Sequence, residues 1–115
     1  MQKQHRWMFF MVPTLLALAF LACDDDTTAP QQGTAVEVKD NEFEPRNLLV
    51  TSNQTITWTW SGSNQHNVTF DDPSIGNSID QATGLFTKAF VVSGAYAYHC
   101  TIHGAAVMSG TVTVQ

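Results

Sequence analysis

The sequence predicts an all-β domain over residues 34–115, of the β-sandwich or small-barrel kind. Apolar and polar residues alternate with a period of two along most of its apolar runs, which is the pattern of half-buried strands. Turn-forming residues interrupt these runs at short intervals, and no segment shows convincing helical periodicity. A domain of about 80 residues with many short strands is expected to form a β-sandwich or a small β-barrel.

The clearest strand covers residues 55–60, where Ile56, Trp58 and Trp60 share one face. Near the other end of the chain, Tyr96 and Cys100 fall on the same face of a later strand. Aromatic side chains are expected in the core or at its rim: Trp58, Trp60, Phe70, Phe90, Tyr96 and Tyr98. The candidate strands are 35–38, 48–50, 55–60, 66–70, 85–92, 96–100 and 112–114.

Composition and charge exclude several classes of protein. Hydrophobic residues make up 43% of the chain and charged residues 13%, which is typical of a globular domain and too apolar for a disordered one. The net charge of −5 leaves no basic surface for nucleic acid. Residues 34–115 hold three basic and seven acidic residues, which suits either a basic partner or solubility alone.

The N-terminal residues 1–22 have the layout of a secretory signal peptide. Lys3 and Arg6 are followed by an apolar run over residues 7–22. That run is short for a membrane span, which needs roughly 20 apolar residues. A permanent N-terminal anchor helix is the alternative. With either reading the domain is exported, to the periplasm or the outer face of the cell membrane.

Cys23 follows this run directly and resembles the lipidated cysteine of bacterial lipoproteins. Phe20 and Leu21 depart from the residues that such signals prefer, so ordinary cleavage nearby is the alternative. Lipidation would associate the protein with the membrane. Residues 23–33 combine charge, Thr, Pro and Gln without apolar periodicity and are expected to form a flexible tether.

Cys100 is the one cysteine of the expected domain, and it begins a pattern that suits a metal. An unpaired thiol outside the cytoplasm is a liability unless it is buried or bound. His103 and Met108 follow with the spacing C-x2-H-x4-M, at the end of a strand and in the loop beyond it. Thiolate, imidazole and thioether form a soft ligand set that suits copper, whereas zinc rarely takes Met.

A further ligand should come from a neighbouring strand, and His66 is the obvious candidate. Two histidines, one cysteine and a weak axial methionine make up the ligand set of blue copper proteins. His99 precedes the cysteine and points to the opposite face of its strand by alternation, so it is not expected to bind the metal.

With these motifs in order, the domain resembles the cupredoxins of the plastocyanin, halocyanin and amicyanin type. The resemblance implies a Greek-key β-sandwich of seven to eight strands, with one type-1 copper at one end and outer-sphere electron transfer. It also implies ring-nitrogen ligation by both histidines, thiolate ligation by Cys100 and a long axial bond to Met108. The segments that carry the resemblance are 41–45, 48–50, 55–58, 66–68, 94–98 and 98–114.

The resemblance also implies a contact that supports the ligands, and this chain departs from plant plastocyanins near it. Asn67 matches a position that ties its loop to the residue after the cysteine, so an Asn67–Thr101 hydrogen bond is expected. His99 stands where those proteins often carry Tyr, and Ile102 where they carry Pro. These differences argue against a photosynthetic partner and leave the copper site intact.

The expected function is that of an extracytoplasmic blue copper protein that shuttles single electrons between Cu(I) and Cu(II), is not an enzyme, and acts as a monomer. Its donor and acceptor are redox proteins that the sequence does not identify. A copper carrier or storage protein is the alternative with the same ligands, and a module serving one fixed enzyme is another. A hydrolase using Cys100 as nucleophile, His66 or His103 as base and Asn67 as orienting residue is a rival from a different class.

Overall fold

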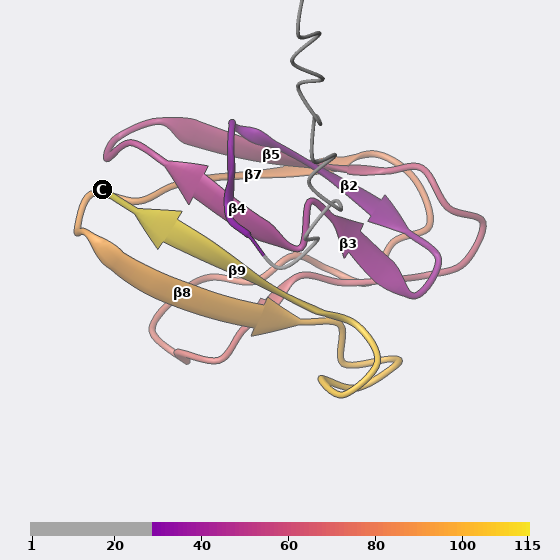
Figure 1. Ribbon diagram of the computed structural model, residues 1–115. Helices are drawn as coiled ribbons and strands as arrows, with labels where there is room; N and C mark the ends of the chain where they lie inside the picture. Colours follow the sequence, from indigo (N-terminus) through magenta and orange to yellow (C-terminus); the bar gives the residue numbers. More distant parts are fainter. Residues whose placement is uncertain (1–28) are drawn as a thin grey trace, which may run out of the picture.

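A computed structural model describes residues 29–115, which form two β-sheets packed into a sandwich (Figure 1). The all-β fold predicted from alternation is confirmed. The expected signal peptide, residues 1–22, and the expected lipidation site, Cys23, lie outside the described residues. No helix in the described part of the chain is long and apolar enough to cross a membrane.

Nine strands divide between the two sheets in residues 29–115. One sheet has the order β1-β4-β9-β8-β6 and the other the order β3-β2-β5-β7. The strands are β1 Gln31–Gln32, β2 Ala35–Lys39, β3 Glu42–Glu44, β4 Asn47–Val50, β5 Thr55–Trp60, β6 Thr69–Phe70, β7 Leu85–Ala89, β8 Gly94–His99 and β9 Ser109–Val114.

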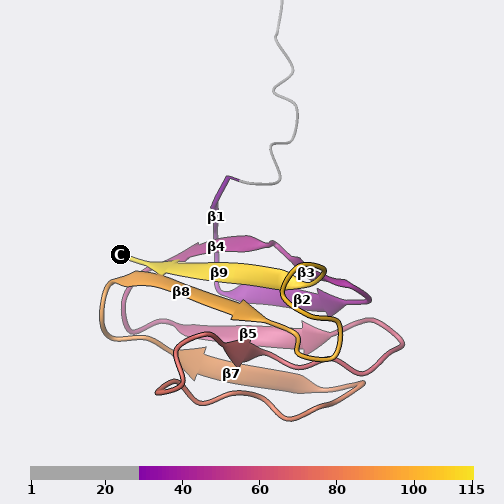
Figure 2. The ribbon, with the colours of Figure 1, turned by 90° about the horizontal axis from the view of Figure 1, so that it is seen from below.

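The strand pairings determine at which end of the sandwich the loop between β8 and β9 lies. β2 runs parallel to β5, and β4 runs parallel to β9, while β8 and β9 form an antiparallel pair. The loop between β8 and β9 therefore lies at the end of the molecule opposite the C-terminus, as Figures 1 and 2 show. The β8–β9 register extends to His99 opposite Ser109, so the intervening loop begins and ends at fixed points.

The core between the sheets follows the predicted alternation. Trp58 is fully buried and meets Tyr98 edge to face, with ring centroids 5.7 Å apart. Phe43 packs on the same tyrosine at 4.8 Å. Such aromatic pairs add about 0.5–1.5 kcal/mol each beyond the burial of their area. The buried hydrophobic residues are Val36, Val38, Phe43, Leu48, Val50, Ile56, Trp58, Trp60, Val68, Phe70, Phe90, Tyr98, Cys100, Met108, Val112 and Val114.

The strand expected over residues 66–70 is reduced to β6, because side chains of a later loop accept hydrogen bonds from its backbone N–H groups. His66 pairs only with Gln81, in an isolated bridge. The N–H of Val68 donates to the Ser78 hydroxyl, and that of Phe70 donates to the Asn77 side chain. Because loop side chains take these donors, the segment leaves the regular ladder before β6.

The edges of the sheets also differ from the expected strands. β3 is not among the expected strands, because its one apolar residue, Phe43, lies between two glutamates and gives no repeat. β1 lies inside the expected tether, where Gln31 and Gln32 pair with Leu48 and Leu49 of β4. The strand expected over residues 85–92 ends at Ala89. The regular structure thus begins upstream of the expected boundary at residue 34.

Gly110 of β9 is required by close packing against Tyr98. A Cβ atom at this position would lie 2.6 Å from the Tyr98 hydroxyl oxygen and 2.9 Å from the Arg46 carbonyl oxygen. Neither the buried tyrosine nor the paired backbone can move away cheaply. The absence of a side chain at this residue therefore allows β8 and β9 to pack against the core.

We expect Gly110→Ala to lower the free energy of unfolding by about 1–3 kcal/mol, because the added methyl group overpacks the core. Chemical denaturation of the metal-free protein measures this change. Gly33→Ala is the matched control, since its Cβ would meet nothing closer than 3.8 Å. Equal stability of the two variants would show that the tyrosine adjusts without cost.

Candidate metal centre

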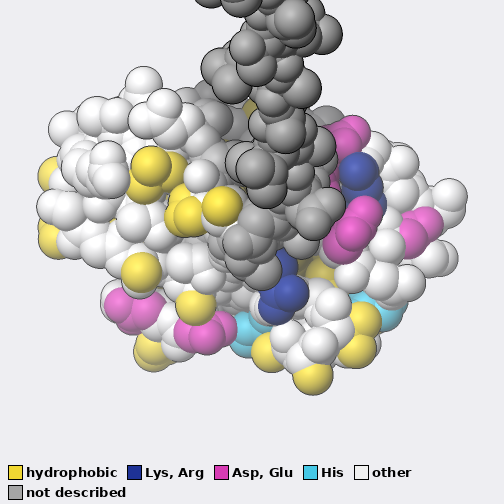
Figure 3. Space-filling model, viewed as in Figure 1, with side chains coloured by type: hydrophobic (Ala, Val, Ile, Leu, Met, Phe, Trp, Pro, Cys, Tyr) yellow, Lys and Arg dark blue, Asp and Glu magenta, His cyan; other side chains and the backbone are white. Residues whose placement is uncertain are grey.

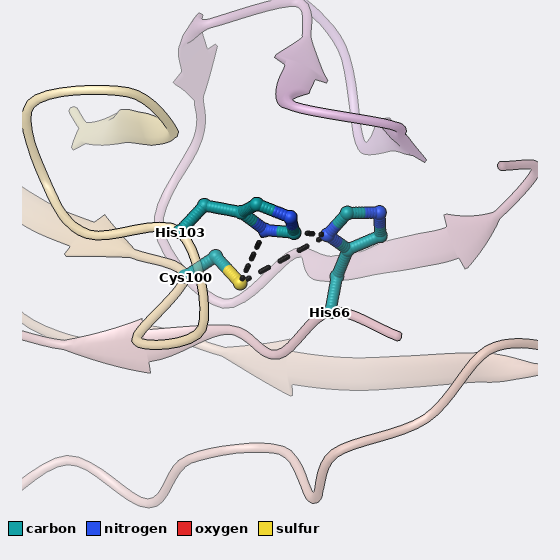
Figure 4. A group of neighbouring side chains, drawn as sticks. All are labelled: His66, Cys100 and His103. Carbon is teal, nitrogen blue, oxygen red and sulfur yellow. Dashed lines mark hydrogen bonds between the residues drawn. The ribbon is translucent and has the colours of Figure 1, made fainter. Parts of the chain in front are cut away.

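Three side chains with metal-binding atoms meet at the end of the sandwich that carries the β8–β9 loop. His66 lies on the segment between β5 and β6, Cys100 directly follows β8, and His103 lies in the loop beyond it (Figure 4). One ligand atom from each residue lies within 4.8 Å of the others. The structure thus brings together three of the four ligands predicted from sequence.

The atoms that face one another are the two Nδ1 atoms and the thiol sulfur. His66 Nδ1 lies 3.2 Å from His103 Nδ1 and 3.9 Å from Cys100 Sγ. His103 Nδ1 lies 3.6 Å from the same sulfur. His66 and Cys100 are fully buried, whereas His103 is partly exposed. The cluster is therefore closed on its inner side and open to the surface only along His103.

Backbone hydrogen bonds fold the loop back on itself and bring Met108 beside Cys100. The Cys100 N–H donates to the Met108 carbonyl at 3.0 Å, and the Gly104 N–H donates to the Cys100 carbonyl at 2.9 Å. Gly104 has a φ of 81°, a left-handed conformation that glycine adopts without strain. The Met108 side chain is fully buried. The backbone thus holds the predicted fourth ligand next to the cysteine.

The donor set fits a type-1 copper ion. Two imidazole nitrogens and one thiolate that converge on a common point form the trigonal His2Cys arrangement, to which blue copper centres add a long axial thioether. A soft thiolate together with imidazole suits copper in both of its oxidation states. Buried lone pairs that point at one another are costly unless a proton or a metal ion lies between them. The chemistry of these residues therefore matches one copper ion per chain.

His66 has a further partner on its outer side. Its Nε2 lies 3.0 Å from Oδ1 of Asp40, in the turn between β2 and β3. The Asp40 carboxylate also accepts hydrogen bonds from the backbone N–H groups of Ser63 and Asn64. The hydrogen bond from His66, and then those from Asn64 and Ser63, lower the pKa of Asp40 to about 2. Sequence reasoning missed Asp40, because nothing in its local pattern points to a site.

Asn67 joins the two segments that supply the buried ligands. Its side-chain amide donates to the Thr101 hydroxyl at 2.7 Å, and its side-chain oxygen accepts the Thr101 N–H at 3.1 Å. The same amide donates to Asp80 at 2.7 Å, and Thr69 donates to the Asn67 oxygen. The hydrogen bond expected between Asn67 and Thr101 is therefore present, as part of a larger network.

His99 lies outside the cluster, as its place on the strand predicts. Its Nδ1 lies 2.8 Å from Oδ1 of Asp71, and its side chain is about a quarter exposed. Alternation along β8 turns Tyr98 and Cys100 into the core and His99 outward. This histidine binds an exposed aspartate and takes no part in the three-residue group.

The surface around His103 is apolar. Ile102 and Val107 expose 47% and 60% of their area, and Ala105 and Ala106 are exposed between them. Figure 3 shows hydrophobic and histidine side chains together along the edge of the molecule where the β8–β9 loop lies. The loop that carries the exposed edge of the cluster thus presents uncharged side chains, and beyond Val107 the surface continues into a hollow lined by Glu42, Glu44 and Arg46.

Comparison with known proteins agrees with this geometry. A family model described as a cupredoxin-like domain matches residues 12–114. The plastocyanin of Scenedesmus fuscus is 31% identical over 84 residues, which are 64% of this chain and 86% of that protein. The chloroplastic plastocyanin of Oryza sativa subsp. indica is 34% identical, and the match covers 64% of this chain and about half, 54%, of the rice protein.

Solved structures give the same fold. A purple cupredoxin from Nitrosopumilus maritimus superposes with a TM-score of 0.64 at 27% identity, over 72% of this chain and all of that chain. A reduced amicyanin variant gives a TM-score of 0.62 at 27% identity, over 72% of this chain and 82% of its own. A copper-containing nitrite reductase from Thermus scotoductus shares the fold at 20% identity and a TM-score of 0.63, over 76% of this chain and 22% of its own.

The sandwich, the convergence of a thiol and two imidazoles beside its β8–β9 loop, and the match over residues 12–114 lead to one conclusion: this chain belongs to the cupredoxin-like domain family.

Proposed function

We propose that the protein is a blue copper electron carrier that passes single electrons between partner proteins outside the cytoplasm. The observation that carries this proposal is the convergence of His66 Nδ1, His103 Nδ1 and Cys100 Sγ at one end of the sandwich. In this proposal Met108 is the axial ligand. Bound copper would supply the one-electron couple between Cu(I) and Cu(II).

The residues of the chain supply a rigid frame for that couple. Electron transfer is fast when the ligands keep one geometry in both oxidation states. Cys100 and Met108 are joined through the backbone, and Asn67 bonds both to the loop that follows the cysteine and to Asp80. A ligand so fixed moves little when the charge on the metal changes.

The exposed edge of His103 provides the path between the centre and a partner. His66 and Cys100 have no exposed area, so the His103 ring is the ligand nearest to solvent among the three. The apolar side chains around it, Ile102 and Val107, would exclude water when a partner docks. Direct ligand exposure through one imidazole suits transfer of an electron and offers no place for a substrate to bind the metal.

The alternative functions lack comparable support. All four proposed ligand positions are filled by this chain, which leaves no open coordination position for a reaction. Cys100 is fully buried, so a substrate could not reach it as the nucleophile of a hydrolase. Nothing in residues 29–115 favours the copper-carrier alternative over electron transfer.

The proposal extends to location and partners. The charged start, apolar run and Cys23 of the sequence favour export, with a lipid anchor that would hold the domain at the outer face of the membrane. The donor and acceptor would be redox proteins that dock on the apolar end around His103. The protein would act as a monomer, since that end must remain free for two successive partners.

Adding one equivalent of Cu(II) to the purified metal-free protein tests the proposal directly. We expect an intense visible thiolate-to-copper band that ascorbate bleaches and an oxidant restores. Cys100→Ser should remove the band, whereas Cys23→Ser, the control with the other cysteine replaced, should keep it. A band that survives in Cys100→Ser, or no band in the unaltered protein, would exclude this function.

Met108→Gln should keep the intense band and lower the reduction potential, because an amide oxygen stabilises Cu(II) better than a thioether does. We expect the potential to fall by more than about 59 mV, which corresponds to a tenfold change in the ratio of the Cu(II) and Cu(I) affinities. Voltammetry measures it, with exposed Val107→Ala as the control in the same loop. An unchanged potential would show that Met108 is not the axial ligand.

Asn67→Ala should destabilise the metal-free domain by about 1–3 kcal/mol, because it removes the hydrogen bonds that the buried Asn67 side chain makes with Thr101 and Asp80. It should also slow electron self-exchange of the copper form, because the cysteine loop loses its tie. Asn64→Ala is the control, since Asn64 contacts Asp40 through its backbone. Self-exchange as fast as in the unaltered protein would mean that the network does not limit ligand movement.

A further inference from the structure

We propose that Asp40 is a positioning residue of the metal centre, which fixes the His66 ring with Nδ1 toward the metal and favours the oxidised ion through its charge. The inference rests on the proposed copper site. Its starting point is the 3.0 Å contact between His66 Nε2 and Asp40 Oδ1, on the side of the ring away from Cys100 and His103.

The contact determines which ring nitrogen is free to bind. An ionised carboxylate only accepts hydrogen bonds, so His66 Nε2 must carry the proton that it donates to Asp40. In a neutral imidazole the other nitrogen, Nδ1, then presents its lone pair. Nδ1 is the atom that faces His103 and Cys100. Asp40 therefore selects the tautomer that the proposed ligation needs.

The carboxylate is itself held in place from a second direction. Oδ1 accepts the N–H groups of Ser63 and Asn64 at 3.1 and 3.0 Å, and Oδ2 accepts the Ser63 N–H at 3.0 Å. Gly62 makes this approach possible, because a Cβ there would lie 2.8 Å from the Asp40 backbone nitrogen and closer still to Oδ1. A carboxylate anchored by two backbone donors can orient an imidazole as a mobile surface side chain cannot.

The negative charge of Asp40 lies beside a proposed ligand and is not neutralised by a lysine or arginine in the described part of the chain. Within residues 29–115 no lysine or arginine forms an ion pair with this carboxylate, and the adjacent Lys39 turns to Glu37 and Glu42 instead. His66 is fully buried and Asp40 is about one-third exposed, so solvent screens the charge only in part. A negative charge one imidazole away from the metal stabilises Cu(II) more than Cu(I), because the interaction grows with the charge of the ion.

Asp40 would thus influence the reduction potential through His66. Met108 would influence the same potential as a ligand. A merely structural role is the competing explanation, since Asp40 also ties the β2–β3 turn to the loop before His66. The two explanations differ in the potential, because a structural tie has no reason to distinguish Cu(II) from Cu(I).

Asp40→Asn tests the charge while keeping the size and an oxygen acceptor. We expect the visible band to remain and the Cu(II)/Cu(I) affinity ratio to fall by about tenfold, a rise of about 59 mV in the potential. Asp72→Asn is the matched control, because it removes the same charge from a carboxylate that bonds to Ser74. An unchanged potential in Asp40→Asn, or an equal rise in both variants, would overturn the proposal.

A measurement on the metal-free, unaltered protein decides the positioning role even if Asp40→Asn does not fold. Nitrogen-15 NMR at pH 8 reports which His66 nitrogen carries the proton, and we expect Nε2. A proton on Nδ1, or an equal mixture of tautomers, would overturn the inference. Absence of the blue band in the unaltered protein would instead refute the copper function, so the two failures are distinguishable.

Discussion

The convergence of two imidazole nitrogens and a thiol sulfur at one end of the sandwich is the constraint on which the rest of the structure depends. Donor atoms 3.2 to 3.9 Å apart that face a common point need a shared proton or a metal ion between them. The fold must therefore hold these atoms together from outside. The contacts around the site do this from several elements, each of which fixes a different ligand.

Cys100 and His66 are held by contacts with other elements of the fold. The β8–β9 ladder, closed at His99 opposite Ser109, fixes both ends of the loop that contains Cys100. The parallel pairing of β2 with β5 brings the turn that contains Asp40 to the segment before His66. The geometry of the site therefore depends on contacts from several elements.

Sequence reasoning recovered the parts of this arrangement that have a local signal. The alternation of β5 was read over all six of its residues, whereas the expected strands over 96–100 and 112–114 cover only part of β8 and β9. The spacing of Cys100, His103 and Met108 is likewise local, because one short loop contains all three. The two-residue β1 and the three-residue β3 have no readable period. Asp40 was missed since its role depends on a pairing between segments, and its own neighbours resemble an ordinary turn.

Charged residues are placed differently around the exposed ligand His103 and around the buried ligand His66. Among the loop residues that surround His103, Ile102 and Val107 are apolar and well exposed, and none from Thr101 to Met108 carries a formal charge. The acidic residues of the domain lie outside this loop, at positions such as Glu42, which lines the same hollow as Val107, and Asp72. Charges outside the apolar loop can steer a basic partner while the loop itself makes the uncharged contact. Asp40 is the exception, since its carboxylate lies against a ligand, and there its charge acts on the metal instead of on the partner.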